Sequence, residues 1–484
     1  MNVHFLLIPV FLPLVLGAVS YFIPFRAPGH RNAYVMAALL VSAAAVWVAA
    51  LMVPETTLPI LQFTDQLSFS LRLDGAGRLF SCLSATLWPL TALYAFDYMK
   101  HEQHHAMFYC FFTMSFGTTM GIAMAENILT MYLFYEMLTV TTIPLVMHGM
   151  TKVHNRAARK YMIYSFGGAA FAFAAVVFLI LNGAGSFVPG GHLSDVDDRS
   201  LAHVLYIFAF LGFGVKAAVF PFHGWLPNAS VAPTPVTALL HAVAVVKAGA
   251  FALIRMTYYA YGTAFLSGTW VQYAVMAIAA ATILYGSVSA LRQKHFKRRL
   301  AYSTVSNLSY IAFAVTLMTP AGLLAAFCHL VFHSVIKICA FFAAGAVMHY
   351  SDREYVPQLE GLGRKMPVTF GLFAISALGL TGIPPFCGFF SKWYISTAAL
   401  ETGNGLAIAG VAVLLVSAFL TACYMLAPVI KAFFPRAGAD NDLTGVKEAN
   451  WRMLVPMAVC AAACVLLGLF AHVPVNLFRE VLSL

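Results

Sequence analysis

Five charged side chains fall inside apolar segments of the sequence, where charge is costly. Glu136 lies in the middle of NILTMYLFYEMLTVTTIPLVM, and a carboxylate placed in hydrocarbon costs several kcal/mol. The other four are lysines in four further apolar segments, Lys216, Lys247, Lys337 and Lys392. Because these five charges lie in five different segments, the pattern predicts a series of proton or ion stations across a helical bundle. A static ion pair of Glu136 with Lys216 is the alternative, but it leaves three lysines without a partner.

Histidines extend this series. His329, His333 and Lys337 are spaced four residues apart, so in a helix they share one face, with about 6 Å between neighbours. Neutral imidazole both accepts and donates a proton, which lets such a face pass protons where water fills the gaps. The HxxxH spacing also occurs in zinc sites, but a lysine as the third member argues against a metal. His241 lies in the same apolar segment as Lys247.

A polar stripe precedes these histidines in the sequence. Ser303, Ser306, Asn307 and Tyr310 recur at helical spacing. Such residues either hold ordered water or form hydrogen bonds to neighbouring membrane helices. The two interpretations are compatible.

Prolines interrupt two of the charged segments. Pro221 and Pro227 follow Lys216, and the pair Pro384-Pro385 precedes Lys392. Proline removes backbone hydrogen bonds, so a break at membrane depth persists only where the freed carbonyls face protein or a polar cavity. Two broken helices five segments apart predict an inverted repeat, with a functional site near each break.

The composition indicates the environment of these elements. The chain has 484 residues, of which 61% are hydrophobic and only 10% are charged, as expected for an all-α polytopic membrane protein. The net charge of +10 does not indicate nucleic-acid binding, because the basic residues fall in short connections between apolar segments. The eight cysteines form no CxxC pair and show no metal-ligand spacing, so we expect no disulfide framework, no metal and no cofactor in this chain.

Fourteen apolar segments are long enough to be candidate membrane helices. They lie near residues 4–24, 33–53, 76–97, 107–125, 127–147, 160–183, 202–221, 232–256, 269–291, 299–318, 321–349, 366–399, 406–434 and 451–473.

The basic residues predict the orientation of these segments. The odd-numbered connections and their flanks carry nineteen Lys and Arg residues, and the even-numbered ones carry four. By the positive-inside rule, the odd connections should be cytoplasmic and both termini should lie on the outer side. The first segment lacks a basic leader and a small-residue cleavage site, so we expect a retained helix. The predicted location is the inner, or cytoplasmic, membrane.

Five motifs, in order along the chain, resemble those of a known family. They are LFYEML, VKAAVFPFHGWLPNASVAPTPVTALLHAVAVVKAGAFALIR, KRRLAYSTVSNLSYI, HLVFHSVIKICAFFAAGAV and GIPPFCGFFSKW. Together they are similar to the antiporter-like subunits shared by respiratory complex I, multisubunit cation/proton antiporters and energy-converting membrane-bound hydrogenases. The resemblance covers roughly residues 100–430.

The resemblance implies a fold and a division of the chain. It implies helices 4–8 and 9–13 related by inverted topology, with helices 7 and 12 broken. The corresponding units are residues 1–106 for the N-terminal helices, 107–256 and 257–434 for the two repeat units, and 435–484 for a C-terminal loop and helix 14.

The resemblance also implies roles for the charged residues. Glu136 and Lys216 would be the interacting pair of the first half-channel, and Lys247 or His241 the central relay. Lys337 with the His333 stripe would continue the path, and Lys392 would be its terminal station. Some family members carry a Glu at the place of Lys392, so this chain departs from that branch.

The sequence thus predicts a proton-translocating, antiporter-like subunit of a larger membrane complex, with Na⁺ as a further candidate ion. Other membrane subunits, including related antiporter-like ones, are the expected partners. Any redox reaction, whether linked to NADH, ferredoxin or hydrogen, would belong to a peripheral module. Two alternatives stay open: a stand-alone secondary transporter for a cation or solute, and a structural subunit that does not pump.

Overall fold

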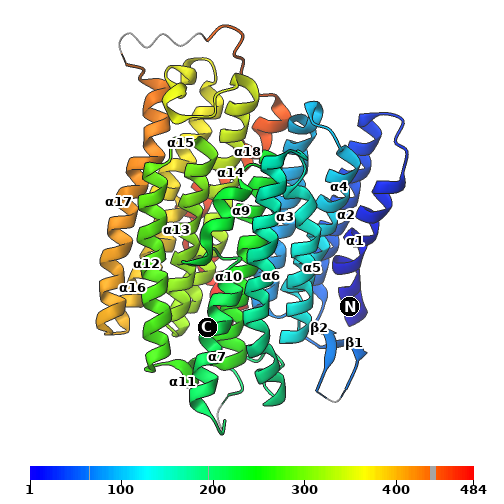
Figure 1. Ribbon diagram of the computed structural model, residues 1–484, viewed down its shortest axis with the longest axis vertical. Coiled ribbons are helices and arrows are strands. Elements are labelled where there is room, and N and C mark those ends of the chain that lie inside the picture. The colour runs from blue at the N-terminus through cyan, green and yellow to red at the C-terminus, as the bar shows by residue number, and fades with distance from the viewer. Residues whose placement is uncertain (65, 194–195, 437–442) are drawn as a thin grey trace.

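The chain folds into one bundle of helices that run mostly side by side, with connections gathered at two ends (Figure 1). The computed structural model describes residues 1–64, 66–193, 196–436 and 443–484. Among these residues, eleven helices are long and apolar enough to cross a membrane, so the chain is a multi-pass membrane protein. Both termini lie toward the end of the bundle that carries the strands (Figure 1).

The first half of the chain supplies ten α-helices and two strands. The strands β1 (Leu58–Gln62) and β2 (Ser68–Leu71) form an antiparallel hairpin. The helices are α1 (Leu7–Phe22), α2 (Pro28–Met52), α3 (Gly75–Tyr98), α4 (His105–Ala123), α5 (Ile128–Val146), α6 (Lys152–Leu181), α7 (Arg199–Gly214), α8 (Trp225–Ala229), α9 (Thr234–Ala242) and α10 (Val245–Ile254).

The second half begins with a π-helical turn, Arg255–Tyr261, that continues α10. The remaining helices are α11 (Thr263–Leu266), α12 (Trp270–Arg292), α13 (Phe296–Thr316), α14 (Pro320–Ser351), α15 (Pro367–Thr381), α16 (Cys387–Glu401), α17 (Gly405–Phe433), α18 (Trp451–Leu469) and α19 (His472–Val481).

Each of the fourteen predicted segments contains a helix, but the count of fourteen spans is not confirmed. Eleven segments match the helices that can cross a membrane. The other three are shorter or more polar: α7 has 16 residues, α15 and α16 have 15 each, and α13 begins with charged residues. The division into two inverted repeat units stays a prediction.

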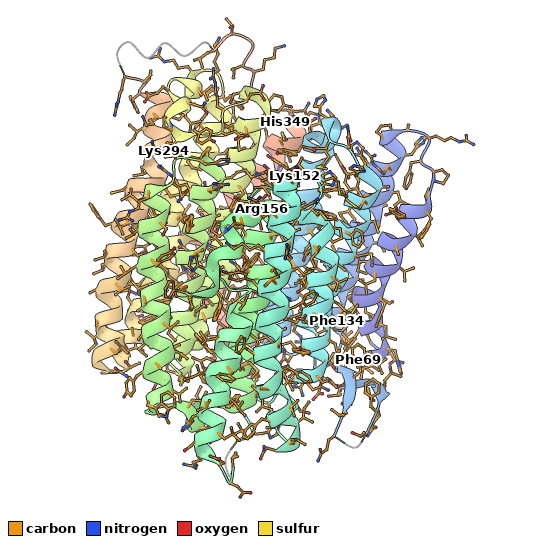
Figure 2. All side chains as sticks on the ribbon, viewed as in Figure 1. Phe69, Phe134, Lys152, Arg156, Lys294 and His349 are labelled. Atoms are coloured by element: carbon orange, nitrogen blue, oxygen red, sulfur yellow. The ribbon has the colours of Figure 1, made fainter. Side chains whose placement is uncertain are left out.

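The hairpin was not predicted from the sequence, and it anchors the start of α5. The rings of Phe69 in β2 and Phe134 in α5 lie 5.5 Å apart between centroids (Figure 2). The backbone N–H of Ser70 donates to Thr130 Oγ1 at 3.0 Å. Asn127 caps α5 by accepting from the Thr130 N–H at 2.8 Å, which satisfies a donor that the helix leaves free. These contacts fix where α5 begins.

Basic side chains gather at the opposite end of the bundle. Lys152, Arg156 and Lys294 lie toward the end away from Phe69 and Phe134 (Figure 2). This arrangement agrees with the charge asymmetry between odd and even connections.

Candidate functional site

The first proline-rich break follows α7, and side chains from other helices donate hydrogen bonds to two carbonyls beside it. After α7 ends at Gly214 the chain turns irregularly, and the carbonyl of Phe213 accepts a hydrogen bond from the Tyr135 hydroxyl at 2.9 Å. The carbonyl of Val215 accepts one from Trp225 Nε1 at 2.7 Å. An irregular backbone at membrane depth needs such internal partners. Side chains from α5 and α8 therefore stabilise the break.

Lys216 lies in this break and contacts the residue next to Glu136. Its side chain is fully buried, and Nζ donates to the backbone carbonyl of Tyr135 and lies 3.4 Å from the centroid of the Tyr135 ring. Glu136 is half-buried, and its Oε1 has no hydrogen-bond partner. Among the described residues no ion pair within 4.0 Å joins Glu136 to Lys216, so the structure does not show the static ion pair that was the alternative, and the interacting pair stays a prediction. The two charges interact through space.

A third break, which the sequence did not reveal, separates His241 from Lys247. The predicted continuous helix 232–256 is interrupted between α9 and α10, where the N–H groups of Val243 and Ala244 both donate to the carbonyl of Leu239, at 3.0 and 2.9 Å. One carbonyl shared by consecutive N–H groups widens the helix locally, as in a π-bulge. His241 therefore lies in the last turn of α9, and Lys247 lies in the first turn of α10.

Gly249 brings α10 against the first break. A Cβ at this position would lie 2.4 Å from the backbone nitrogen of Ala217 and 2.8 Å from the carbonyl carbon of Lys216. Only glycine allows the backbones to approach so closely. Lys247, two residues earlier, is thereby held near the helix break that carries Lys216.

A line of polar contacts runs from α10 through α14 to α16. Lys247 Nζ lies 2.6 Å from His333 Nδ1, and both side chains are at most 1% exposed. The His333 ring stacks on that of His329 with 5.6 Å between centroids. His329 Nδ1 lies 2.9 Å from the hydroxyl of Ser391, which is the residue directly before Lys392 in the sequence. The α14 stripe predicted from the sequence therefore runs from Lys247 to Ser391, the residue before Lys392.

Lys337 branches away from this line. Its Nζ donates to the Ser303 hydroxyl and, at 2.9 Å, to the carbonyl of Leu300 in α13. The predicted polar stripe on α13 is buried: Asn307 Nδ2 donates to the Ser303 carbonyl at 2.8 Å, and the Tyr310 hydroxyl donates to the carbonyl of Leu414 at 3.1 Å. Ser303 and Tyr310 thus join α13 to α14 and α17, as the second interpretation of the stripe expects, whereas Asn307 bonds its own helix.

Lys392 lies beside the second proline-rich break and caps it. Its Nζ donates to the carbonyls of Leu380 and Thr381 at 2.7 and 2.9 Å, the last residues of α15. An ammonium at this end satisfies free carbonyls and faces the negative end of the helix dipole. A Cβ at Gly388 would lie 1.9 Å from the Gly379 carbonyl oxygen, so glycine lets α16 pack closely on α15.

His241 and Lys297 lie off the main line. His241 is fully buried against the Phe341 ring, at 4.8 Å between centroids, and neither ring nitrogen has a partner among the described residues. Lys297 and Arg299 were counted among the basic residues of a predicted cytoplasmic connection, yet both are buried in α13. Lys297 Nζ donates to the carbonyl of Ala232 before α9, at 2.8 Å. Sequence reasoning missed Lys297 because it lies in the KRR run at the segment's start.

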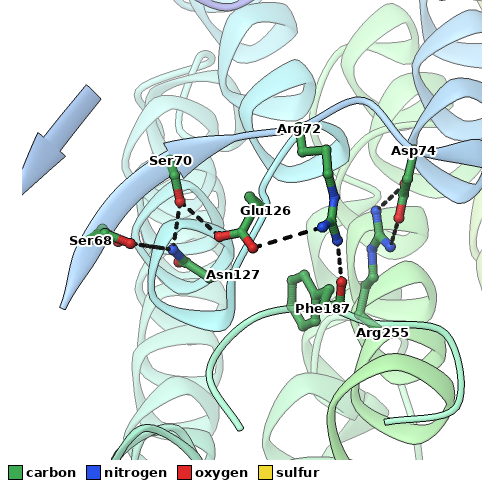
Figure 3. A network of polar contacts seen from close by, with 8 residues as sticks. All are labelled: Ser68, Ser70, Arg72, Asp74, Glu126, Asn127, Phe187 and Arg255. Carbon is green, nitrogen blue, oxygen red and sulfur yellow. Dashed lines mark hydrogen bonds and ion pairs between the residues drawn. The ribbon is translucent and has the colours of Figure 1, made fainter. Parts of the chain in front are cut away.

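A second missed group is the buried ion pair of Asp74 and Arg255 (Figure 3). Arg255 lies inside a predicted apolar segment and is 1% exposed, and its guanidinium donates to both carboxylate oxygens of Asp74 at the start of α3. The two residues are 181 positions apart, so no local spacing could have paired them.

Beside this pair, a polar network ties β2 to the start of α5 (Figure 3). Arg72 lies 3.9 Å from Glu126 and donates to the carbonyl of Phe187. The Ser70 hydroxyl donates to Glu126 at 2.8 Å and accepts from the Asn127 amide at 2.8 Å. The network fixes the N-terminal end of α5 and thus the position of Glu136 along the bundle.

Comparison with known proteins identifies the chain's relatives. The model of the family described as NADH:quinone oxidoreductase/Mrp antiporter, TM, matches residues 125–421, a stretch that holds every predicted site residue. The chain belongs to this family. The predicted family resemblance is therefore confirmed. The A/B component of a potassium/proton antiporter of Rhizobium meliloti is 31% identical over 83% of this chain and 40% of its own length.

Two further curated relatives from this family are similar over most of the chain. The A1 component of a sodium/proton antiporter of Staphylococcus aureus is 29% identical over 86% of this chain and 54% of its own length. The N component of the NADH-quinone oxidoreductase of Desulforudis audaxviator is 33% identical over 78% of this chain and 77% of its own length. The chain thus spans about half the length of the antiporter relatives and a larger share of the oxidoreductase relative.

Two solved structures share the fold. A chain of the Mrp complex from Dietzia sp. DQ12-45-1b has a TM-score of 0.86 at 23% identity, covering 98% of this chain and 52% of that one. A chain of an archaeal membrane-bound sulfane sulfur reductase has a TM-score of 0.86 at 22% identity, covering 99% and 97%. The family fold therefore extends over nearly the whole chain, and both neighbours come from membrane complexes.

Proposed function

We propose that this chain is a proton-translocating, antiporter-like subunit of a multisubunit membrane complex. The observation that carries the proposal is the contact of Lys247 with His333. Two groups that both become cations cannot both hold a proton at 2.6 Å in a low-dielectric interior without strong repulsion. One of them is therefore neutral and accepts the hydrogen bond, so the pair holds a mobile proton between α10 and α14.

The contacts support an order of stations. Glu136 and Lys216 form the first half of the path, and Lys247 is the central relay because it is bonded to His333. His241 has no such bond and stays a secondary candidate. The path continues over His333 to Lys392, where the chain of polar contacts ends. Lys337 lies off this path and influences it through the electrostatic effect of its charge.

We further propose a place in the cell. The basic end of the bundle (Figure 2) faces the cytoplasm by the positive-inside rule, and both termini face the outer side of the cytoplasmic membrane. The odd-numbered connections would then be cytoplasmic.

The relatives suggest two kinds of complex. One is a cation/proton antiporter, in which Na⁺ or K⁺ is exchanged for protons, as the names of two relatives indicate. The other is a redox complex, in which a peripheral module oxidises a reduced donor. In either case this chain supplies ion translocation and no redox cofactor.

The experiment is purification of the chain through an affinity tag, identification of the co-purifying subunits, and reconstitution in proteoliposomes with a pH-sensitive dye. We expect proton movement only by the assembled complex, and loss of it in Lys247→Ala. Transport by the chain alone would identify a stand-alone secondary transporter. Unchanged transport by an assembled Lys247→Ala complex would identify a structural subunit.

A further inference from the structure

A cavity of about 600 Å³ opens between the ends of α2, α3, α4 and α18, far from the line of lysines. Part of its lining is apolar and aromatic, with Met36, Leu93, Phe96 and Tyr109. Its volume lies in the range of pockets that bind small organic ligands.

Another part of the lining carries positive charge. Arg31, Lys100 and Arg452 line the cavity, each from a different part of the chain, His105 adds an imidazole, and no carboxylate lines it. Cations repel one another, so a pocket that collects them from separate elements is stabilised by an anion. The three cations thus favour a negatively charged ligand.

Two of these cations lack an acidic partner. Lys100 binds Asp97, but neither Arg31 nor Arg452 forms an ion pair within 4.0 Å among the described residues. The Arg31 guanidinium lies 5.0 Å from the centroid of the Tyr109 ring, and its Nε is buried without a hydrogen-bond partner. A planar guanidinium held this way presents donors that match phosphate oxygens.

The pocket lies at a membrane–water interface. Helices α2, α4 and α18 begin there and α3 ends there, at the basic end of the bundle. Trp451, at the start of α18, is 59% exposed, and tryptophan is enriched at the level of lipid headgroups. On α2, about one turn beyond Met36, Leu40 and Val41 are more than half exposed and offer an apolar surface to an acyl chain.

We propose that this pocket binds the phosphate of an anionic phospholipid, with the acyl chains along the outer face of α2. Basic pockets between membrane helices on the cytoplasmic side recognise such headgroups. Free phosphate shares the negative charge and the acceptor oxygens, but it would not use the apolar part of the lining. The inference does not depend on the proposed translocation.

The test uses the full chain in its purified complex, delipidated in detergent and titrated with phosphatidylglycerol, phosphatidylcholine or inorganic phosphate. Native mass spectrometry measures the bound lipid. We expect preference for phosphatidylglycerol, with affinity about fivefold weaker for each cation removed in Arg31→Gln and Arg452→Gln. Arg364→Gln is the matched control, since Arg364 is exposed on the same side of the bundle and does not line the pocket.

A second measurement keeps the test decisive if a glutamine variant does not fold. Arg31→Lys and Arg452→Lys keep the charge and should retain most of the phosphatidylglycerol preference. Equal loss in Arg364→Gln, or no loss in either pocket variant, overturns the proposal. Displacement of the bound lipid by equimolar inorganic phosphate would assign the pocket to a free anion, and a cross-link from the Arg452→Cys variant to another subunit would assign it to a protein partner.

Discussion

Lys247 Nζ and His333 Nδ1 lie 2.6 Å apart, so one hydrogen bond joins α10 to α14 inside the bundle. Each side chain would be costly there alone, because an unpaired polar group in a low-dielectric interior loses its hydration. Their contact makes the pair one unit with one shared proton. The consequence is a specific pattern of mutant effects.

We predict that Lys247→Ala and His333→Ala each reduce proton translocation about a hundredfold, the lower range for loss of a proton-transfer group. The double variant should be no worse than either single one, because residues that act as a unit are not additive. The measurement is dye quenching in proteoliposomes. Ser334→Ala is the control, since the Ser334 hydroxyl bonds only its own helix, at Leu330. Additive losses would contradict a shared proton.

Glu136→Gln should abolish translocation while the complex still assembles. Glutamine keeps the shape of the side chain and removes the charge that acts on Lys216. Because Glu136 Oε1 accepts no hydrogen bond, a purely structural role predicts almost no effect. Assembly is checked by size-exclusion chromatography, and Glu401→Gln controls for loss of an exposed carboxylate. Normal translocation by an assembled Glu136→Gln complex would remove this residue from the path.

The buried pair of Asp74 and Arg255 predicts a stability effect. Asp74→Asn keeps the helix cap toward the Gly77 N–H but leaves a buried guanidinium unpaired, which should lower the free energy of unfolding by about 3–5 kcal/mol. Asp198→Asn is a matched control, because Asp198 also caps a helix, α7, but is exposed and pairs with no buried cation. Thermal unfolding in detergent measures both. Equal shifts in the two variants would mean that the pair contributes little.

The same pair has a defined pH dependence. Burial raises the pKa of the Asp74 carboxyl, but the Arg255 guanidinium and the Gly77 N–H bring this pKa below its ordinary value. A lowered folded-state pKa adds stability that is complete above the unfolded pKa and disappears as pH falls through the folded one. The difference in unfolding temperature between wild type and Asp74→Asn should therefore stay constant above about pH 5 and shrink only in stronger acid. A difference that grows on acidification would contradict this sign.

The sequence predicted the two proline breaks because proline has a direct physical effect on a helix. Pro221 and Pro384 remove donors, and a lysine beside each break indicated function before any contact was known. The stripe of His329 and His333 was predictable for the same reason, because helical spacing alone puts both on one face.

Other parts of the site depend on contacts between distant segments. The break between His241 and Lys247 contains neither proline nor glycine, and Gly249, shortly after it, packs against the distant segment that holds Lys216. Asp74 and Arg255 meet only after folding. On the sequence alone, Lys297 was assigned to a connection, because basic residues are counted along the chain before their burial is known.

Lys392 provides the last prediction, which separates a proton station from a fixed counter-charge. Its ammonium caps the carbonyls of Leu380 and Thr381 at the end of α15. Arginine can donate to the same carbonyls, so Lys392→Arg should preserve the break and the assembly of the complex. Guanidinium does not release its proton at physiological pH.

We therefore expect Lys392→Arg to lose translocation nearly as fully as Lys392→Ala, although only the alanine variant loses the cap and some thermal stability. The measurements are proton translocation in proteoliposomes and unfolding temperature in detergent, each on the same preparations. Lys365→Arg and Lys365→Ala, at an exposed lysine before α15, control for the substitutions themselves. If Lys392→Arg translocates protons like wild type, this ammonium only holds α15 in place, and protons leave the path before Lys392, at the Ser391 hydroxyl or earlier.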